Sequence, residues 1–163
     1  GRSIVLLFSG CEMLYNVTLP SGIKSIKSHM FEGCTSIQEI TIPLNVTEIS
    51  DEAFKNCSNL KSVYIGNNVK SIYSYAFENT ALRELEIPAS VTSIEGNAFG
   101  MRYSEVSGEY CAIPDFVATV TDNSVALKYC KDNGIAILVF NLEDPENIIR
   151  AVKGENIGTL VKE

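Results

Sequence analysis

Phenylalanines recur along the first hundred residues at a nearly constant interval. Phe8, Phe31, Phe54 and Phe77 lie 23 residues apart, and Phe99 follows 22 residues later. A fixed period of roughly 20–50 residues is the signature of stacked repeats, in which each unit packs on its neighbours instead of forming a globule of its own. The period therefore predicts a solenoid in which equivalent side chains line up along one axis.

The other positions of the period keep step with the phenylalanines. Four aliphatic columns run through the same repeats: Ile23, Val46, Val69 and Val91; Ile26, Ile49, Ile72 and Ile94; Leu19, Ile42, Ile65 and Ile87; and Leu14, Ile37, Leu60 and Leu82. Two more columns are Cys11, Cys34 and Cys57, and the corner residues Pro20, Pro43, Gly66 and Pro88. Because each column holds one class of side chain, we expect the columns to form ladders along the axis.

Residues 37–59 show what one repeat, or coil, contains. Ile40 and Ile42 alternate with polar residues, which predicts a strand with one buried face. Pro43 ends this strand because proline cannot donate a hydrogen bond to a ladder. Residues 46–49 begin and end with an aliphatic side chain, which predicts a second, shorter extended stretch.

The rest of the coil turns the chain back toward the next strand. Residues 51–55 are too few for an independent helix, and they predict one helical or 3₁₀ turn that directs Phe54 into the interior. The Asn-Cys-Ser-Asn run at 56–59 is typical of a turn. The predicted fold class is a β-rich solenoid with coils of about 23 residues, each made of a strand, a corner, a short strand and a turn.

This unit resembles L-x-x-I-x-I-P-x-x-V-x-x-I-x-x-x-A-F-x-x-C-x-x-L, the repeat of the BspA-like, bacterial surface-antigen class of leucine-rich repeat proteins. The stretches IQEITIPLNVTEISDEAFKNCSNL and LRELEIPASVTSIEGNAF carry the match, which covers about residues 3–100. The chain departs from the unit at Met30, at Gly66 and in the coil that begins at Leu60, which is one residue short. The resemblance implies a leucine-rich repeat solenoid over residues 1–100, with about four full coils and a partial first coil, in a cell-surface or extracellular adhesion protein.

The first eleven residues allow two interpretations. Arg2 followed by IVLLF and SGC resembles the end of a lipoprotein signal, with lipid on Cys11. FSGCEML also matches FEGCTSI and KNCSNL in phase, as the close of an earlier coil, and the short apolar run favours this second interpretation. Because the chain does not begin with methionine, we expect a fragment or a processed product.

Composition argues against several classes of function. The chain has 163 residues and a formal net charge of −7, which disfavours nucleic acid and anionic membranes as partners. It has no run of 18 apolar residues, so no membrane span is expected. The single histidine, His29, has no serine or cysteine partner at a motif spacing and is expected to be a surface side chain. No two cysteines have the C-x₂-C spacing, so neither a metal site nor a cofactor is predicted.

Three of the five cysteines share one phase of the repeat. Cys11, Cys34 and Cys57 are therefore expected to stack as small buried thiols, since cysteine is one of the most often buried residues. Disulfide bonds among them are an alternative that the spacing does not require.

The period stops after Phe99. Residues 101–117 contain the breakers Gly108 and Pro114 and are expected to form an irregular connector. Residues 118–163 predict a small α/β cap with the order helix, strand, helix, strand. Its expected parts are a helix capped by Asp122 or Asn123 that carries Val125, Leu127 and Tyr129 and ends at Asn133–Gly134, a buried strand at 135–140, a second helix from Pro145 to Gly154, and a final strand at 158–162.

Two resemblances compete over this cap. ALKYCKDNGIAIL is similar to the strand–helix–strand end of BspA-like arrays. Residues 120–163 are also similar to the carboxyl end of bacterial uridylate (UMP) kinase, through Asp122 and Ala126, VFNL at 139–142, Pro145 and GENIGTLV at 154–161. The kinase resemblance implies phosphoryl transfer from ATP to UMP, with Asp122 at the one matching position near the active site.

The parts that phosphoryl transfer requires are otherwise missing from the sequence. The reaction needs backbone amides and cations around the phosphates, but LLFSG has the Ser-Gly of the kinase turn without its lysine, and no other glycine-rich phosphate loop occurs. The tail is therefore interpreted as a structural cap derived from a kinase, a gene fusion or a joining error in the sequence.

The outward positions of the repeated strands are the candidate binding face, because they line up across coils. The candidates are Thr18, Thr41, Tyr64 and Glu86 between the buried strand residues, and Tyr15, Gln38, Lys61 and Arg83 beside them. Tyrosine and arginine are enriched at the energetic centres of interfaces, so this set favours a protein or glycan ligand. The alternative is an ordinary solvated sheet face.

Three hypotheses for function follow. The first is a non-enzymatic module that binds a protein or glycan through the candidate binding face. The second is a relic or fusion of uridylate kinase with nucleotide contacts around Asp122. The third is a purely structural spacer.

Overall fold

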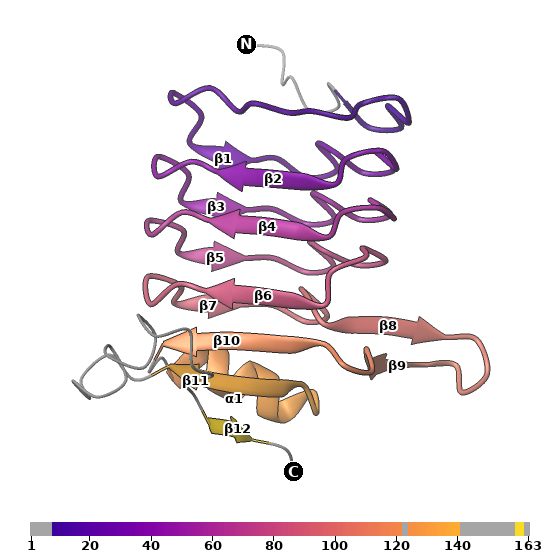
Figure 1. Cartoon of the computed structure of the whole chain (residues 1–163), viewed down its shortest axis with the longest axis vertical. Helices are drawn as coiled ribbons and strands as arrows, with labels where there is room; N and C mark the ends of the chain where they lie inside the picture. Colours follow the sequence, from indigo (N-terminus) through magenta and orange to yellow (C-terminus); the bar gives the residue numbers. More distant parts are fainter. Residues whose placement is uncertain (1–7, 122–123, 141–158, 162–163) are drawn as a thin grey trace, which may run out of the picture.

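The computed structural model describes residues 8–121, 124–140 and 159–161, and its coils stack along one axis (Figure 1). The elements within these residues are β1 (Ser25–Ile26), β2 (Glu39–Ile42), β3 (Glu48–Ile49), β4 (Ser62–Ile65), β5 (Ser71–Ile72), β6 (Glu84–Ile87), β7 (Ser93–Ile94), β8 (Met101–Ser104), β9 (Glu109–Ala112), β10 (Val117–Thr121), α1 (Ser124–Asp132), β11 (Ala136–Phe140) and β12 (Thr159–Val161). The architecture confirms the predicted β-rich solenoid with a small α/β cap.

The short strands form a continuous parallel sheet along one side of the stack. β1, β3, β5 and β7 pair in that order, and Ile26, Ile49, Ile72 and Ile94 lie in register across them. The first three of these isoleucines are fully buried. The isoleucine column of the sequence is therefore a physical ladder, as the period predicts.

The longer strands form a second row, drawn as the front arrows in Figure 1. β2 pairs with β4, and β6 pairs with β10, in both cases in parallel. β11 and the antiparallel β12 extend the second pair into a four-stranded sheet. Among the described residues no pairing joins β4 to β6, so the front row is divided into two sheets at that point.

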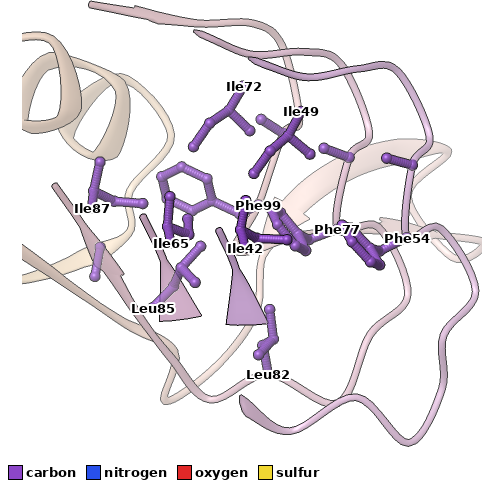
Figure 2. Packing of buried hydrophobic residues seen from close by; sticks show 14 of the residues in the cluster. Ile42, Ile49, Phe54, Ile65, Ile72, Phe77, Leu82, Leu85, Ile87 and Phe99 are labelled. Atoms are coloured by element: carbon purple, nitrogen blue, oxygen red, sulfur yellow. The ribbon is translucent and has the colours of Figure 1, made fainter. Parts of the chain in front are cut away.

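The phenylalanines form the stack that the period predicts. Phe54 lies between Phe31 and Phe77, with ring centroids 5.3 Å from each and ring planes within 5° of parallel. Phe8 continues the stack 5.4 Å from Phe31. These distances match the offset stacking that aromatic rings prefer, and Figure 2 shows Phe54 and Phe77 in line among buried aliphatic side chains. Burial of each ring contributes about 1.5–3 kcal/mol of stability.

The turn that carries each phenylalanine differs from the helical turn that was expected. Glu52 and Asn56 have φ angles of 54° and 61°, so the chain makes successive tight turns around Phe54 instead of a helix. The N–H of Phe54 then donates a 2.8 Å hydrogen bond to the carbonyl oxygen of Ala76 in the next coil. Left-handed residues recur at the same two phases in other coils, at His29, Gly33, Tyr75, Asn79 and Asn97. These turns therefore tie each coil to its neighbour at the base of the aromatic stack.

The cysteine column is buried only in part. The thiols of Cys34 and Cys57 are fully buried and donate to the carbonyl oxygens of Phe8 (2.9 Å) and Phe31 (3.0 Å), respectively. Cys11 is exposed, which corrects the expectation that it is buried, because no described coil packs over that end. All five cysteines are free thiols, so the thiol ladder and not the disulfide alternative describes Cys34 and Cys57.

Residues 101–117 are more regular than the expected connector. β8 and β9 pair as an antiparallel hairpin that projects sideways from the stack (Figure 1). Gly108, with a φ of 72°, closes the hairpin by donating to the carbonyl oxygen of Ser104 (2.8 Å). Two four-residue strands outside the repeat carry too little periodicity for the sequence to predict them.

The cap closes the solenoid through the last phenylalanine. Phe99 leaves the parallel stack and contacts the rings of Phe116 (6.2 Å between centroids) and Tyr129 (4.7 Å). The Tyr129 hydroxyl donates to the carbonyl oxygen of Phe99 (2.9 Å) and accepts from its N–H (3.2 Å). α1 therefore satisfies backbone groups that another coil would otherwise pair.

The predicted helix at the start of the cap, the buried strand after it and the final strand correspond to α1, β11 and β12. The predicted second helix, from Pro145 to Gly154, and the capping positions Asp122 and Asn123 lie outside the described residues, as do residues 1–7 of the apolar start. No helix in the described part of the chain is long and apolar enough to cross a membrane.

Gly66 stands where other coils have proline, and the structure explains why. A Cβ at Gly66 would lie 2.8 Å from the carbonyl oxygen of Ile42 and 2.9 Å from that of Pro43. Gly66 directly follows β4, and Pro43 directly follows β2. These two front strands of the repeats pair with each other. Glycine is therefore needed where two front strands approach closely, and proline occupies the corner in coils whose front strands do not pair with the coil before.

We expect Gly66→Pro, which would restore the family pattern, to destabilise the protein by about 1–3 kcal/mol, because backbone atoms on both sides must move apart. The measurement is urea unfolding followed by circular dichroism. Gly22→Ala is the matched control: nothing lies within 4 Å of its Cβ position, so its effect should stay within about 0.5 kcal/mol. Equal stability of Gly66→Pro and the parent chain would show that close approach does not select glycine here.

Candidate binding face

All eight residues of the candidate binding face are exposed on the front row: Tyr15, Thr18, Gln38, Thr41, Lys61, Tyr64, Arg83 and Glu86. Thr41 and Tyr64 are direct partners in the ladder of β2 and β4. Glu86 lies on β6, the next strand along the row, and pairs with Thr119 of β10. Tyr15 and Tyr64 expose 54% and 52% of their surface, respectively, which is large for aromatic side chains.

A neighbouring column of the same face was missed by the sequence analysis. Glu39, Ser62 and Glu84 are exposed at the first position of their strands, two residues before Thr41, Tyr64 and Glu86. The signal was present, because alternate residues of a strand point to the same face. The polar part of the face is therefore one column wider than predicted, and more acidic.

Hollows lie where the front strands do not pair. Two of them, of about 430 and 390 Å³, separate the segment at residues 15–18 from β2, with Tyr15, Asn16 and Glu39 in their walls. Two more, of about 240 and 250 Å³, follow the break between β4 and β6. Val63, in the wall of the second pair, is half-buried, whereas Ile40 and Leu85 at its phase are buried. The face thus offers shallow polar hollows rather than one deep pocket.

The charges of the face have no ion-pair partners within the described structure. Lys61 and Arg83 flank one end of the break between β4 and β6, and Glu84 and Glu86 lie along β6. Exposed charges of both signs favour a ligand with complementary charges and fix its orientation. The face is therefore suited to a ligand of mixed polarity.

A second polar cluster lies away from this face, on the edge of the solenoid that is formed by the turns carrying the phenylalanines. We call this edge the turn edge. The carboxylate of Glu78, which is only 4% exposed, accepts a hydrogen bond from the Tyr110 hydroxyl (2.7 Å) and lies 3.1 Å from the Lys55 ammonium. Lys55 also lies 3.1 Å from Glu52 and 5.5 Å from the ring centroid of Tyr75. Partial burial alone would lower the pKa of Lys55, but its hydrogen bonds to the two carboxylates raise it.

This cluster joins two successive coils and the β8–β9 hairpin, so its role in stability is clear from the geometry. Removing one partner of a buried carboxylate leaves an uncompensated charge, which costs more than an exposed pair contributes. The sequence showed the Glu52–Lys55 spacing, but the partner Tyr110 comes from the hairpin that the repeat did not predict.

The cap contains an apolar hollow of about 250 Å³, lined by Ile113, Phe116, Cys130 and Ile137 among others. Asp115 and Lys131 are the charged residues in its wall. Asp122, the predicted kinase-like position, lies outside the described residues. The described cap therefore presents an apolar hollow, not a cluster of cations suited to phosphates.

Comparison with known proteins identifies the repeats. Residues 6–105 match the BspA-type leucine-rich repeat region in six copies, and the chain belongs to this family. The fold is similar to that of a leucine-rich repeat protein from Bacteroides ovatus, with a TM-score of 0.59 and 26% identity, over 72% of this chain and 36% of that chain. A leucine-rich cell surface protein from Faecalibacterium prausnitzii is also similar, with a TM-score of 0.45 and 21% identity, over 69% of this chain and 50% of that chain.

A curated relative is of a different kind. The chain is 36% identical over 61 residues to the chloroplast uridylate kinase PUMPKIN of Arabidopsis thaliana. The match covers 37% of this chain and 16% of that kinase. The kinase resemblance of the sequence analysis is therefore real but partial, and it does not establish catalysis.

Several buried groups of the repeats and the cap resist ionisation. Burial raises the pKa of Cys57, Cys130 and Tyr129 to about 12. Burial together with the hydrogen bond to Glu78 raises the pKa of Tyr110 to about 12. Solvent-exposed thiols ionise near pH 9.0 and solvent-exposed phenols near pH 10.0, so the unfolded chain loses these protons first as the pH rises. Stability is therefore fully present below about pH 9 and falls as the pH approaches 12.

We expect the urea midpoint of unfolding to stay constant between about pH 7 and 8.5 and to fall steadily from about pH 9 upward. Cys130→Ala removes one of the groups with a raised pKa, so its midpoint should fall less steeply over the same range, although it starts lower. A midpoint that stays level to pH 11 in the parent chain would contradict the assignment of these groups as buried and protonated.

Proposed function

We propose that this protein is a non-enzymatic recognition module whose candidate binding face contacts a protein or a glycan. The observation that supports it best is the uncovered front row, where eight predicted residues and the Glu39–Ser62–Glu84 column are all exposed. The phenylalanine and isoleucine ladders fill the interior of the repeats, so the side chains available for recognition are those on the outside. Recognition by such a surface needs no reacting group.

A protein ligand fits the face best. Tyr15, Tyr64 and Arg83 belong to the types that dominate the energy of protein interfaces. Acidic side chains interleaved with Lys61 and Arg83 favour a partner that also carries both charges over a polyanion. A neutral glycan is the alternative, because its hydroxyl groups suit the hollows lined by carboxylates and hydroxyls.

The proposed location is the cell surface or the extracellular space, with a role in adhesion. The support is membership of the BspA-type family, whose resemblance implies surface proteins. The chain spans 36% of the Bacteroides relative, so the function of the whole protein, including any partner in adhesion, is part of this proposal.

Tyr64→Ala and Arg83→Ala should each reduce binding to the ligand at least about tenfold, because truncating a residue that dominates the energy of an interface centre costs about 2 kcal/mol or more. The labelled chain would first be screened on arrays of glycans and extracellular proteins, and affinities then measured by calorimetry. Lys70→Ala is the matched control: Lys70 is exposed beside the short strand β5, on the other side of the coil. Parent-like affinity of both face variants would exclude the candidate binding face, and an absence of any ligand on either array would favour the structural spacer.

The partial match to uridylate kinase supports one rival function, nucleotide binding around Asp122. We expect calorimetric titration of the chain with UMP and with ATP and Mg²⁺ to give no binding heat at micromolar ligand, because the sequence lacks the lysine turn and the glycine-rich loops that hold phosphates. Heat that disappears in Asp122→Ala would instead establish the kinase-related function.

A further inference from the structure

One cluster on the turn edge combines two carboxylates with the single imidazole of the chain. The donor atoms of His29, Glu32 and Glu52 lie within 4.8 Å of one another. His29 Nδ1 is 2.9 Å from Glu32 Oε2 and 3.6 Å from Glu52 Oε2, so the ring nitrogen faces both carboxylates. We propose that these three side chains bind a Zn²⁺-type divalent metal ion, which links the turns of two successive coils.

The distances fit the coordination of zinc. Ligands of a tetrahedral Zn²⁺ at about 2.0–2.1 Å lie about 3.3–3.4 Å from one another. The separations from His29 Nδ1 to Glu32 Oε2 and Glu52 Oε2, 2.9 and 3.6 Å, lie on either side of this value. The donor oxygens of Glu32 and Glu52 lie within 4.8 Å of each other, so rotating the two side chains toward the imidazole would place three donors around one ion, with water in the fourth position.

The donor set also selects the kind of metal. An imidazole nitrogen suits Zn²⁺ and the late first-row metals, whereas Ca²⁺ and Mg²⁺ prefer oxygen ligands alone. The cluster thereby differs from groups of acidic side chains, which occur on many protein surfaces without a metal. Each of the three side chains is partly buried, with 26–40% of its surface exposed, so the ion would be reached from solvent and held by side chains of limited freedom.

The backbone brings the three residues together. Glu52 occupies the same phase of the repeat as His29, one coil later, and both have left-handed φ angles of 54° and 58°. The N–H of His29 donates to the carbonyl oxygen of Asp51 (3.1 Å), which fixes the two turns side by side. Glu32 is three residues after His29, and its N–H donates to the His29 carbonyl oxygen (3.3 Å).

A nearby cation must be accommodated. The Lys55 ammonium lies 3.1 Å from Glu52 Oε2 and would repel a metal at that oxygen. Lys55 has a second partner at the same distance, the buried carboxylate of Glu78. When Glu52 turns toward the metal, Lys55 therefore keeps an ion pair with Glu78.

In the absence of metal, the contact between His29 Nδ1 and Glu32 requires a proton on that nitrogen. A metal ion takes the place of this proton on Nδ1, and the neutral imidazole then carries its proton on Nε2 instead. The chemistry is a ligand exchange at one nitrogen and two carboxylate oxygens, and it involves no oxidation or reduction.

Calorimetric titration of the whole chain with ZnCl₂ tests the proposal. Cys11 is an exposed thiol that could bind zinc by itself, so every variant carries Cys11→Ser. We expect one ion per chain and a thermal unfolding midpoint that rises with zinc concentration, because the metal binds the folded state. Ca²⁺ and Mg²⁺ should give neither effect.

Three variants assign the ligands. His29→Asn, Glu32→Gln and Glu52→Gln should each weaken zinc binding at least about tenfold and remove most of the zinc-dependent rise in the midpoint. Asparagine is chosen at position 29 because Asn97 occupies this phase with a φ of 57°, so the turn tolerates it. Glu48→Gln, at a partly buried carboxylate that pairs with Lys27 (3.8 Å), is the matched control and should bind zinc as the parent does.

Two outcomes would overturn the proposal. One is the absence of zinc binding by the parent chain at concentrations up to about the millimolar range, since structural and catalytic zinc sites are far tighter. The other is binding that survives unchanged in all three ligand variants, which would place the ion elsewhere. Neither outcome bears on the candidate binding face, which lies on the front row.

Discussion

The whole structure depends on hydrogen bonds and aromatic contacts between successive coils. No coil has a core of its own, so Phe54 is buried by Phe31 before it and Phe77 after it. The backbone around each ring donates to the next coil, as in the 2.8 Å bond from Phe54 to Ala76, which holds the turn edge at a constant spacing. Fixing a residue costs about 1–2 kcal/mol of backbone entropy, a cost that one coil cannot offset and a stack can.

Strand pairing is interrupted in the front row but not in the short-strand sheet, which runs without a break through the repeats. The front strands pair as β2 with β4 and as β6 with β10, and the coil between Leu60 and Leu82 is the short one. The corner residue follows this pattern, since Gly66 permits the close approach and proline occupies the other corners. The hollows of the candidate binding face are therefore a consequence of where the strands separate, not of an added loop.

The sequence predicted the parts of the molecule that repeat. One column of phenylalanines was enough to predict the aromatic stack, and alternation at Ile40 and Ile42 predicted β2. The hairpin of β8 and β9 was not predicted because it occurs only once and so has no repeat pattern. Cys11 was expected to be buried because it has the same position in the repeat as Cys34 and Cys57, but that position does not show where the stack of described coils ends. The exposure of the candidate binding face was predicted from the sequence. Its hollows were not, because they depend on the distance between neighbouring strands, which no single residue predicts. The His29–Glu52 contact needed left-handed turns in two coils, and only the folded backbone shows them.

The described part of the cap closes the solenoid through packing and backbone contacts alone. β10 continues the front row in register with β6, and its alternate residues Ala118 and Val120 are fully buried. α1 then brings Tyr129 onto Phe99, where the hydroxyl bonds both backbone groups of that residue. These contacts require an alternating strand, one aromatic helix residue and a second buried strand, which any small α/β fragment can supply. The open end of the array needs only that shape to be covered, whereas phosphoryl transfer would need further residues that the contact between cap and solenoid does not use.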